Sequence, residues 1–482
     1  MIEIRPVVHV LGWLSILVGL FMAIPAAVDL AAGSPDWIPF AESTCFAVGL
    51  GLILSLSTWT RAGAPKLDLR QAFLATILGW ILVAGLGALP MLSLGIGFTD
   101  ALFEAMSGIT TTGSTVLMGL DGLPPGLLLW RALLQWIGGI GIIAVAVLIL
   151  PLLRVGGMQI FKIESSDTSS EKVAGVLATL SLLLAVYAGL TAICAGLYAV
   201  FGMSLFDALT HAFSTVSTGG FSTYDASFGH FQSPILHWTG IVFMIAGALP
   251  FVLYLRTIRR DRRALLRDSQ VRAFLVFMVA VIGLAAVAHS LINDLPFGTA
   301  LTDAAFNIVS VVTTTGFASQ DYTTWGAGAA GFFLVLTFVG GCTGSTSGAI
   351  KIFRYQILWR VVRNHVKRLF SPNRVVRPTY QGRVVDDALV LSVMAFLAVF
   401  IATVAATFLV LALLGLDTLT AFTAAATAVT NVGPGLGPIV GPAGNFAPLP
   451  DAAKLALTGA MLAGRLEILA LLVVFDRDFW GR

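Results

Sequence analysis

The chain has 482 residues, of which 57% are hydrophobic and only 11% charged, and its formal net charge is +3. Soluble domains carry about 25% charged residues, so this composition, with a mean hydropathy of +0.92, excludes a water-soluble globular protein. The three cysteines, Cys45, Cys194 and Cys342, lie far apart without a CxxC pair, which argues against a disulfide framework and against a zinc site.

Apolar runs of about 20 residues recur along the chain, and such runs predict membrane-spanning helices. The first run follows an N-terminus that lacks a long basic region and a small-residue cleavage site, so we expect a retained helix rather than a signal peptide. In chain order, the predicted spans are 7–31, 37–59, 70–92, 127–153, 173–201, 234–256, 272–292, 328–350, 387–414 and 451–475. The sequence therefore predicts a multi-pass membrane protein.

The connections between these spans alternate in charge. One set lacks Lys and Arg altogether: 93–126, 202–233, 293–327 and 415–450. The other set is basic: 60–70, 154–172, 256–272 and 351–383. Short cytoplasmic loops accumulate Lys and Arg, so the basic set is predicted to face the cytoplasm, together with both termini. Nucleic-acid or lipid-binding patches are the alternative, but the alternation at every connection favours a topology signal.

The connections without Lys or Arg contain an internal repeat. Each has a short amphipathic stretch that breaks, after a constant offset, at a cluster of Thr, Ser and Gly: Asp100–Gly113, Asp207–Gly220, Asp303–Gly316 and Thr420–Gly433. These stretches are too short to cross a membrane and predict re-entrant pore helices, with their first residues as N-caps. Amphipathic surface helices are the alternative, which would leave the constant spacing unexplained. A further glycine recurs in each following span: Gly138 and Gly139, Gly247, Gly340 and Gly341, and Gly459.

Turns of this kind, repeated within one chain, can surround a single axis. Irregular backbone at membrane depth needs cover from protein or from a water-filled cavity, and rings of backbone carbonyls replace the hydration shell of a monovalent cation. Glycine permits the positive φ that turns carbonyls inward, and no acidic residue lies in the turns to favour a divalent ion. The predicted filter residues are Thr111, Thr112, Gly113, Thr218, Gly219, Gly220, Thr314, Thr315, Gly316, Asn431, Val432 and Gly433.

The predicted span 328–350 breaks at a Gly/Ser/Thr-rich loop, and broken spans mark ion pathways in transporters. We expect an intramembrane gate there, a flexible kink being the alternative. Arg465 lies in the last span, where an arginine is functional by default unless it snorkels to the cytoplasm, and Glu467 is a poor partner for it. The predicted gate residues are Gly341, Cys342, Thr343, Gly344, Ser345, Thr346, Ser347, Gly348 and Arg465.

Other polar residues have less specific interpretations. Arg131 and Lys454 begin their spans on the outer side, so we expect both at the membrane interface. His211 lies in a pore helix at the position of Glu104, Asn307 and Ala424, which favours packing or capping over a proton relay. The GGCTGSTSG and GPGLG stretches follow no strand, so nucleotide binding by this chain is not expected.

The turn motifs resemble those of a known family. TTTGST (110–115), STGGFST (217–223), TTTGFAS (313–319) and TNVGPGLG (430–437), with GGCTGSTSG (340–348) and LAGRLE (462–467), resemble the membrane subunit of the bacterial Trk potassium uptake system, the TrkH family within the Trk/Ktr/HKT superfamily. The resemblance covers essentially the whole chain. Its fourth turn, Asn431-Val432-Gly433, departs from Thr-Thr-Gly but is similar to other Trk members.

The resemblance implies potassium uptake across a bacterial inner membrane, a homodimer in the lipid bilayer, and a cytosolic regulatory subunit that binds NAD or ATP. It also implies that a glycine in all of the turns goes with a preference for potassium. The expected fold is an all-α integral membrane protein with four units of helix, re-entrant pore loop and helix (M1–P–M2) around one pseudo-fourfold pore, plus an N-terminal helix pair.

The expected parts are an N-terminal pair (1–60) and pore repeats at 61–153, 154–258, 259–370, which includes the loop 340–348, and 371–482. A symporter that couples potassium to protons or sodium is the alternative function. A membrane-embedded enzyme is not expected, because no catalytic set such as HExxH or paired intramembrane aspartates is present. Potassium is the expected ion at the filter, with no covalently bound cofactor and no nucleic acid.

Overall fold

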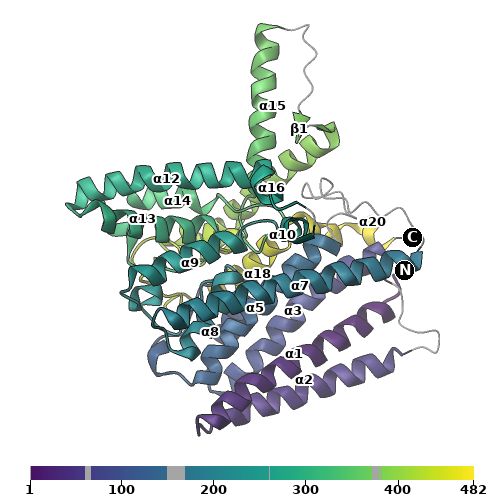
Figure 1. Cartoon of the computed structure of the whole chain (residues 1–482). Helices are drawn as coiled ribbons and strands as arrows, with labels where there is room; N and C mark the ends of the chain where they lie inside the picture. Colours follow the sequence, from purple (N-terminus) through teal and green to yellow (C-terminus); the bar gives the residue numbers. More distant parts are fainter. Residues whose placement is uncertain are drawn as a thin grey trace.

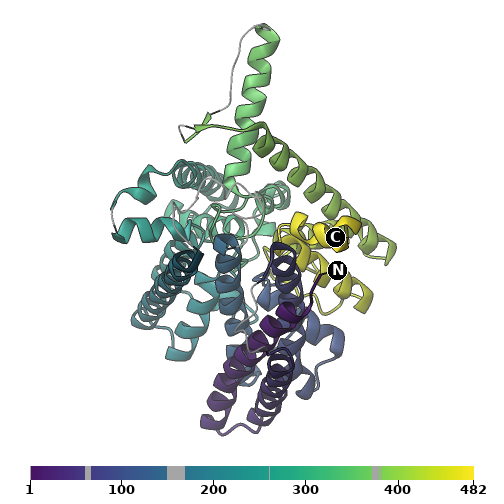
Figure 2. The same ribbon diagram turned by 90° about the vertical axis from the view of Figure 1, so that its right-hand side faces the viewer.

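The computed structural model of the chain describes residues 2–59, 67–148, 169–259, 261–371, 379–381 and 383–481. Within these ranges the fold is helical, with one small antiparallel pair of strands, β1 (Thr379–Tyr380) and β2 (Arg383–Val384). This is the all-α membrane architecture that the sequence predicts, and the long apolar helices lie side by side in two views of the molecule (Figures 1 and 2).

The N-terminal pair forms a hairpin of α1 (Arg5–Ala31) and α2 (Trp37–Ser57). Small residues allow the two backbones to approach closely: a Cβ on Gly51 would lie 2.6 Å from the carbonyl oxygen of Gly12. Such close approach is typical of helix pairs in membranes, where lipid gives no hydrophobic drive for association. The pair lies at one edge of the helical body (Figure 1).

After this pair, a unit of long helix, short helix, turn and helix occurs four times. The units are α3 (Leu69–Ser93), α4 (Phe98–Ile109) and α5 (Pro125–Leu148); α7 (Ser169–Val200), α8 (Leu205–Val216) and α9 (Pro234–Gly247) with α10 (Phe251–Arg259); α12 (Ser269–Asn293), α13 (Phe297–Val312) and α14 (Ala329–Thr337); and α16 (Asp387–Leu413), α17 (Thr418–Thr430) and α18 (Asp451–Arg465). The other α-helices of the described residues are α11 (Ala264–Arg267), α15 (Ile352–Phe370), α19 (Leu469–Leu472) and α20 (Arg477–Trp480).

Seven helices of the described residues are long and apolar enough to cross a membrane, or nine if each of two bent pairs counts as one span. The bends correct the sequence prediction, which took 234–256 and 451–475 as continuous. The first bends by 92° between α9 and α10, where Pro250 lacks the N–H that a continuous helix needs. The second bends by 102° after α18, where Glu467 and Ile468 both have positive φ.

The predicted span 328–350 is helical only as far as Thr337, and a backbone bridge between Val339 and Ile350 closes the loop between them. The break expected there is confirmed. Together with the two bends, it means that the last helix of the second, third and fourth units is interrupted in each case. Long loops of exposed backbone are not tolerated in lipid, and Cys342 and Thr346 within this loop are indeed buried.

The predicted N-caps are wrong, because the short helices begin earlier. The residues at the N-caps are Gly97, Ser204, Pro296 and Asp417. Asp100, Asp207 and Thr420 instead lie in the first turn, and Asp303 lies further inside its helix. Two of the true caps are of the usual type: Ser204 Oγ accepts from the Asp207 N–H at 3.0 Å, and Asp417 Oδ1 accepts from the Thr420 N–H at 3.0 Å.

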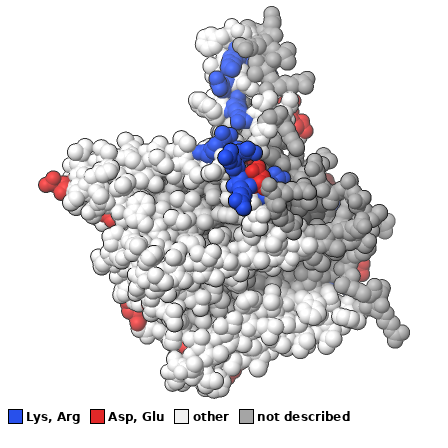
Figure 3. Space-filling model, in the orientation of Figure 1, with Lys and Arg blue, Asp and Glu red and all other residues white. Residues whose placement is uncertain are grey.

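Basic side chains gather at one end of the molecule. Lys and Arg lie along α15, which projects from the helical body, and gather at its base, where an acidic side chain is also seen (Figure 3). Other acidic side chains are scattered along the edges of the molecule. The predicted basic connections 256–272 and 351–383 contribute to this basic end. The connections 60–70 and 154–172 lie largely outside the described residues.

Candidate functional site

The four turns that end the short helices share one backbone conformation. Their second threonine or its equivalent has a left-handed φ: 52° at Thr111, 52° at Thr218, 58° at Thr314 and 56° at Asn431. Two residues later a glycine has a larger positive φ: 86° at Gly113, 80° at Gly220, 82° at Gly316 and 108° at Gly433. Residues with side chains rarely adopt such angles, so the shared shape is imposed by the surrounding structure and orients the carbonyls of all four turns alike.

The turns form a closed ring. A Cβ added to each glycine would lie less than 3.0 Å from a carbonyl oxygen of the next turn: Gly113 from Gly219, Gly220 from Thr315, Gly316 from Val432, and Gly433 from Thr112. The contacts run from the first turn to the fourth and back to the first. The structure thus brings the four turns that carry the predicted filter residues together in one ring, in which each glycine lies against a carbonyl of the next turn.

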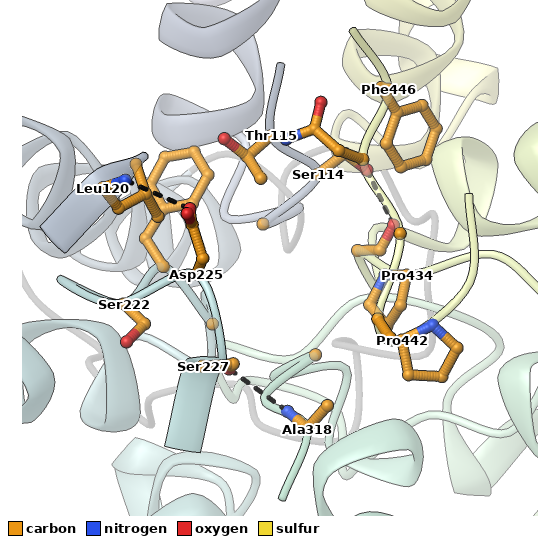
Figure 4. Close-up of a pocket in the computed structure, with 18 of the residues that line it drawn as sticks. Ser114, Thr115, Leu120, Ser222, Asp225, Ser227, Ala318, Pro434, Pro442 and Phe446 are labelled. Atoms are coloured by element: carbon orange, nitrogen blue, oxygen red, sulfur yellow. Dashed lines mark hydrogen bonds between the residues drawn. The ribbon is translucent and has the colours of Figure 1, made fainter. Parts of the chain in front are cut away.

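Hydrogen bonds also join the fourth turn to the first, although the two lie over 300 residues apart. Ser114 Oγ donates to the Gly433 carbonyl at 2.7 Å (Figure 4), and Asn431 Nδ2 donates to Thr112 Oγ1 at 3.0 Å. The departure of the fourth turn from Thr-Thr-Gly therefore has a structural role, because the Asn431 amide reaches across to a threonine of the first turn.

A cavity of about 320 Å³ opens on one side of the ring and is lined by residues of all four turns (Figure 4). Asp225 lines it, and the Asp225 carboxylate accepts backbone N–H groups of Gly119 and Leu120 at 2.9 and 3.1 Å. A carboxylate at the mouth of a narrow pathway raises the local concentration of cations. Asp225 therefore places an acidic side chain beside this cavity.

A polar side chain of each short helix holds the return strand of its own turn in the first three units. The pairs are Glu104 Oε2 with the Val116 N–H (2.9 Å), His211 Nε2 with Ser222 Oγ (2.9 Å), and Asn307 Oδ1 with the Ser319 N–H (3.1 Å). In the fourth unit the aligned residue is Ala424, and the neighbouring Thr423 Oγ1 accepts from the Leu436 N–H at 3.1 Å. These contacts agree with the expected packing and capping role of His211.

The interfacial placement predicted for Arg131 is wrong. Its side chain is 1% exposed and pairs with Glu104 at 2.7 Å. It also donates to the Ser222 carbonyl at 2.8 Å, and its guanidinium lies 4.2 Å from the centre of the Phe221 ring. A buried charge needs such a partner and further hydrogen bonds, so Arg131 ties the first and second turns together. Lys454 is likewise buried, and pairs with the half-exposed Asp100 at 2.6 Å.

A glycine in the last helix of a unit packs against the end of the short helix. The pairs are Gly138 with the Ile109 carbonyl, Gly247 with the Val216 carbonyl and Gly464 with the Val429 carbonyl. Gly459, the recurring glycine of the fourth unit, does not pack in this way, since a Cβ there would meet nothing within 4 Å. A Cβ at the packed positions would overlap the carbonyl oxygens of the short helices, so only glycine allows this approach.

The loop that interrupts the third unit contacts three of the turns. Thr346 Oγ1 accepts from Thr218 Oγ1 at 3.1 Å, and the Gly348 N–H donates to Thr314 Oγ1 at 2.6 Å. The Ala349 N–H donates to the carbonyl at the end of α17 at 2.8 Å. The other predicted gate residues of the loop are Gly341, Cys342, Thr343, Gly344, Ser345 and Ser347, which are all buried.

Arg465 lies beside this loop. Its side chain is 3% exposed, and Nη1 donates to the Thr346 carbonyl at 2.8 Å. Arg465 therefore does not snorkel to the surface. Its Nε and Nη2 atoms are buried and have no hydrogen-bond partner among the described residues. Glu467 pairs instead with Arg354 at 2.6 Å, as expected from its poor position relative to Arg465.

Sequence reasoning missed Gln135. This residue of α5 is fully buried; its Nε2 donates to the Gly219 carbonyl at 2.5 Å, and its Oε1 accepts from the Phe221 N–H at 3.0 Å. The available signal was an amide side chain in an otherwise apolar part of a predicted span, since buried polar groups need partners. The sequence did not reveal that this partner is a turn more than 80 residues away.

Comparisons with known proteins agree with this geometry. The TrkH family model, described as a cation transport protein, matches residues 45–480. The chain is 46% identical to the Trk system potassium uptake protein TrkI of Halomonas elongata, over 98% of this chain and 96% of that protein. It is 34% identical to TrkH of Escherichia coli K12, over 99% of each. The crystal structure of the potassium transporter TrkH from Vibrio parahaemolyticus superimposes with a TM-score of 0.91 at 32% identity, covering 99% of this chain and 100% of that one.

Proposed function

Since this chain belongs to the TrkH family of cation transport proteins, we propose that it is the membrane subunit of a Trk potassium uptake system and conducts potassium through the ring of turns. Its relatives are named as potassium uptake proteins, so the chain is a transport protein and not an enzyme, as the sequence predicted. It spans the lipid bilayer several times, which the apolar helices and these relatives both support.

The proposal of a filter rests on one observation, the closed ring in which each glycine lies against a carbonyl of the next turn. Carbonyl dipoles around one axis replace the water that a potassium ion loses on entry. The turns 110–115, 217–222, 313–318 and 430–435 carry no titratable side chain, and neutral oxygens suit a monovalent cation better than a divalent one. Potassium is thus the cargo that the ring coordinates, and we propose no covalently bound cofactor.

The proposed gate is the loop 340–348 with Arg465. Glycine and serine allow the loop to change conformation at low steric cost, and the loop contacts the turns through Thr346 and Gly348. Arg465 places a positive charge next to the loop, where a cation on the pathway would be repelled in a medium of low dielectric. Both features favour a closed pathway on this side of the ring.

The proposed location is a bacterial inner membrane, with both termini and the basic end in the cytoplasm. The proposed partners are a second copy of the chain and a cytosolic regulatory subunit that binds NAD or ATP, as in the family that the chain resembles. The basic surface of α15 and its base, at the proposed cytoplasmic end (Figure 3), offers a site for such a subunit.

A labelling experiment tests this orientation. Ala226 and Arg262 are both exposed, and the proposal places them on opposite sides of the membrane. In a background with the exposed Cys45 replaced by Ser, Ala226→Cys should react with an impermeant thiol reagent added to intact spheroplasts, and Arg262→Cys should react only after lysis. The reverse pattern would contradict the orientation.

Reconstitution tests the function itself. Purified protein in liposomes under a potassium gradient should give a reversal potential near the potassium equilibrium value at every pH between 6 and 8, a range chosen around the ordinary pKa of histidine. A reversal potential that shifts with the proton or sodium gradient would favour the symporter instead. No response to potassium at all would refute potassium conduction.

A further inference from the structure

The second turn of the ring differs from its counterparts at one position. Gly219 stands where the first and third turns have Thr112 and Thr315 and the fourth has Val432. In the first and third turns the threonine hydroxyl bonds to the threonine two residues earlier: Thr112 with Thr110 at 2.7 Å and Thr315 with Thr313 at 2.8 Å. Gly219 has no side chain to make this bond, so the second turn must be held in another way.

The amide of Gln135 occupies the space of the missing side chain. A Cβ on Gly219 would lie 2.6 Å from Gln135 Oε1 and 2.9 Å from Gln135 Cγ, so any larger residue at 219 would overlap Gln135. The backbone of Gly219 is not in the left-handed region, and therefore its lack of a side chain is required by Gln135 rather than by φ.

The orientation of the Gln135 amide is fixed by its two partners. Nε2 faces a carbonyl, that of Gly219, and Oε1 faces an N–H, that of Phe221. A flipped amide would place an oxygen against an oxygen and a nitrogen donor against an N–H, leaving both partners unsatisfied in a buried site. Gln135 therefore clamps the backbone on both sides of Gly220.

This clamp makes one carbonyl of the ring unlike the others. Among the described residues, no hydrogen bond ends on the Thr112, Thr315 or Val432 carbonyl oxygen, whereas the Gly219 carbonyl accepts one from Gln135. A carbonyl has two lone pairs, so Gly219 still has one to offer to a cation. The hydrogen bond from Gln135 sets the direction of the Gly219 carbonyl and the partial negative charge on its oxygen.

We propose that Gln135 is a positioning residue for ion selection: by clamping the second turn and binding the Gly219 carbonyl, it holds the ring at the size that favours potassium over sodium. The inference rests on the proposed function, since it assigns a residue to the same filter. A filter built from one chain does not require four identical turns, and Gln135 replaces in the second turn the hydroxyl bond of the first and third.

The test changes Gln135 and Gly219, first singly and then together. Gln135→Ala removes both hydrogen bonds and should lower the ratio of potassium to sodium permeability about tenfold, the effect that one or two lost hydrogen bonds can produce. Gly219→Thr alone overlaps Gln135 and should lower the total flux. The double variant Gln135→Ala with Gly219→Thr recreates the threonine turn, with Ser217 as the partner hydroxyl, and should restore the ratio. All fluxes are measured in liposomes and normalised to folded protein.

A matched control separates selection from stability. Met244 is buried and lies three residues before Gly247, as Gln135 lies three before Gly138. Met244→Ala should lower thermal stability without changing the permeability ratio. Gln135→Met, whose side chain has nearly the same length but cannot donate to the Gly219 carbonyl, should lower the ratio even if the alanine variant folds poorly.

Two results would overturn the inference while leaving the proposed function intact. One is a potassium-selective wild type with an unchanged ratio in both Gln135 variants. The other is a lowered ratio that the double variant fails to restore, since Gln135 would then not be standing in for the residue 219 side chain. A wild type without potassium selectivity would instead refute the proposed function, and this inference with it.

Discussion

Gly113→Ala should lower potassium permeability about 10-fold to 100-fold, because inserting a methyl group into a well-packed site costs roughly 1–3 kcal/mol. The Cβ would lie less than 3.0 Å from the Gly219 carbonyl oxygen. That atom belongs to the backbone of the next turn and cannot move aside as a flexible side chain would. Displacing it would open or narrow the ring in the plane of the carbonyls, so we expect potassium-limited growth to fail and the reversal potential in liposomes to shift towards sodium.

Gly95 provides a matched control. Its φ of 87° nearly equals the 86° of Gly113, so an alanine at either position carries the same backbone strain. A Cβ on Gly95, however, would meet nothing within 4 Å. Gly95→Ala should therefore lose only the stability that the backbone strain costs, and keep its selectivity. Equal transport by the two variants, at equal thermal stability, would show that the ring does not line the ion pathway.

Arg465→Ala should raise potassium flux about tenfold and weaken its dependence on a cytosolic regulator, since repulsion between like charges in a partly buried cavity amounts to several kcal/mol at close range. The variant removes both the charge and the bond to the Thr346 carbonyl that holds the loop. The two buried donors without partners, Nε and Nη2, mean that the wild-type side chain is poorly stabilised where it lies. Its removal should therefore cost little stability.

Arg465→Lys distinguishes the effect of the positive charge on flux from the effect of the guanidinium hydrogen bond. A lysine keeps the charge but lacks the planar guanidinium, so an intermediate flux would assign part of the effect to the bond with Thr346. Arg354→Ala breaks a nearby ion pair with Glu467 without touching the loop contact, and should reduce thermal stability without raising flux. A normalised flux at or below wild type in Arg465→Ala would end the gate proposal.

The ring could be predicted from the sequence because its determinants are local. The constant offset from Asp100 to Gly113 and from Asp303 to Gly316 marks a short helix that ends in a glycine turn, although the left-handed φ of Thr111 and Thr314 is imposed by the surrounding structure. The break near Gly340 was predictable for the same reason, since a run of Gly, Ser and Thr lies between apolar residues. The bend at Pro250 had a local signal as well, the missing N–H of proline, although the apolar run on both sides masked it.

Other features depended on partners far along the chain. Arg131 was expected at the interface because it begins a predicted span on the outer side, whereas its burial depends on Glu104 in another helix and on the Ser222 carbonyl of the next unit. The bend after Arg465 has neither proline nor glycine at Glu467 and Ile468, so composition gave no warning. The role of Gln135 was hidden in the same way, because its partners belong to the second turn.

When a single polypeptide supplies all four turns of a filter, the sequence of each turn can change independently of the other three. In a pore made from four copies of one subunit, every substitution is present four times. A contact made at only one of the four junctions, such as that of the Asn431 amide with Thr112, is then excluded by symmetry. In the filter proposed here, one codon changes a single turn of the ring. Single substitutions should therefore change ion preference by different amounts, from a loss of potassium-limited growth where a backbone carbonyl is displaced, as in Gly113→Ala, to smaller shifts where only a supporting hydrogen bond is lost.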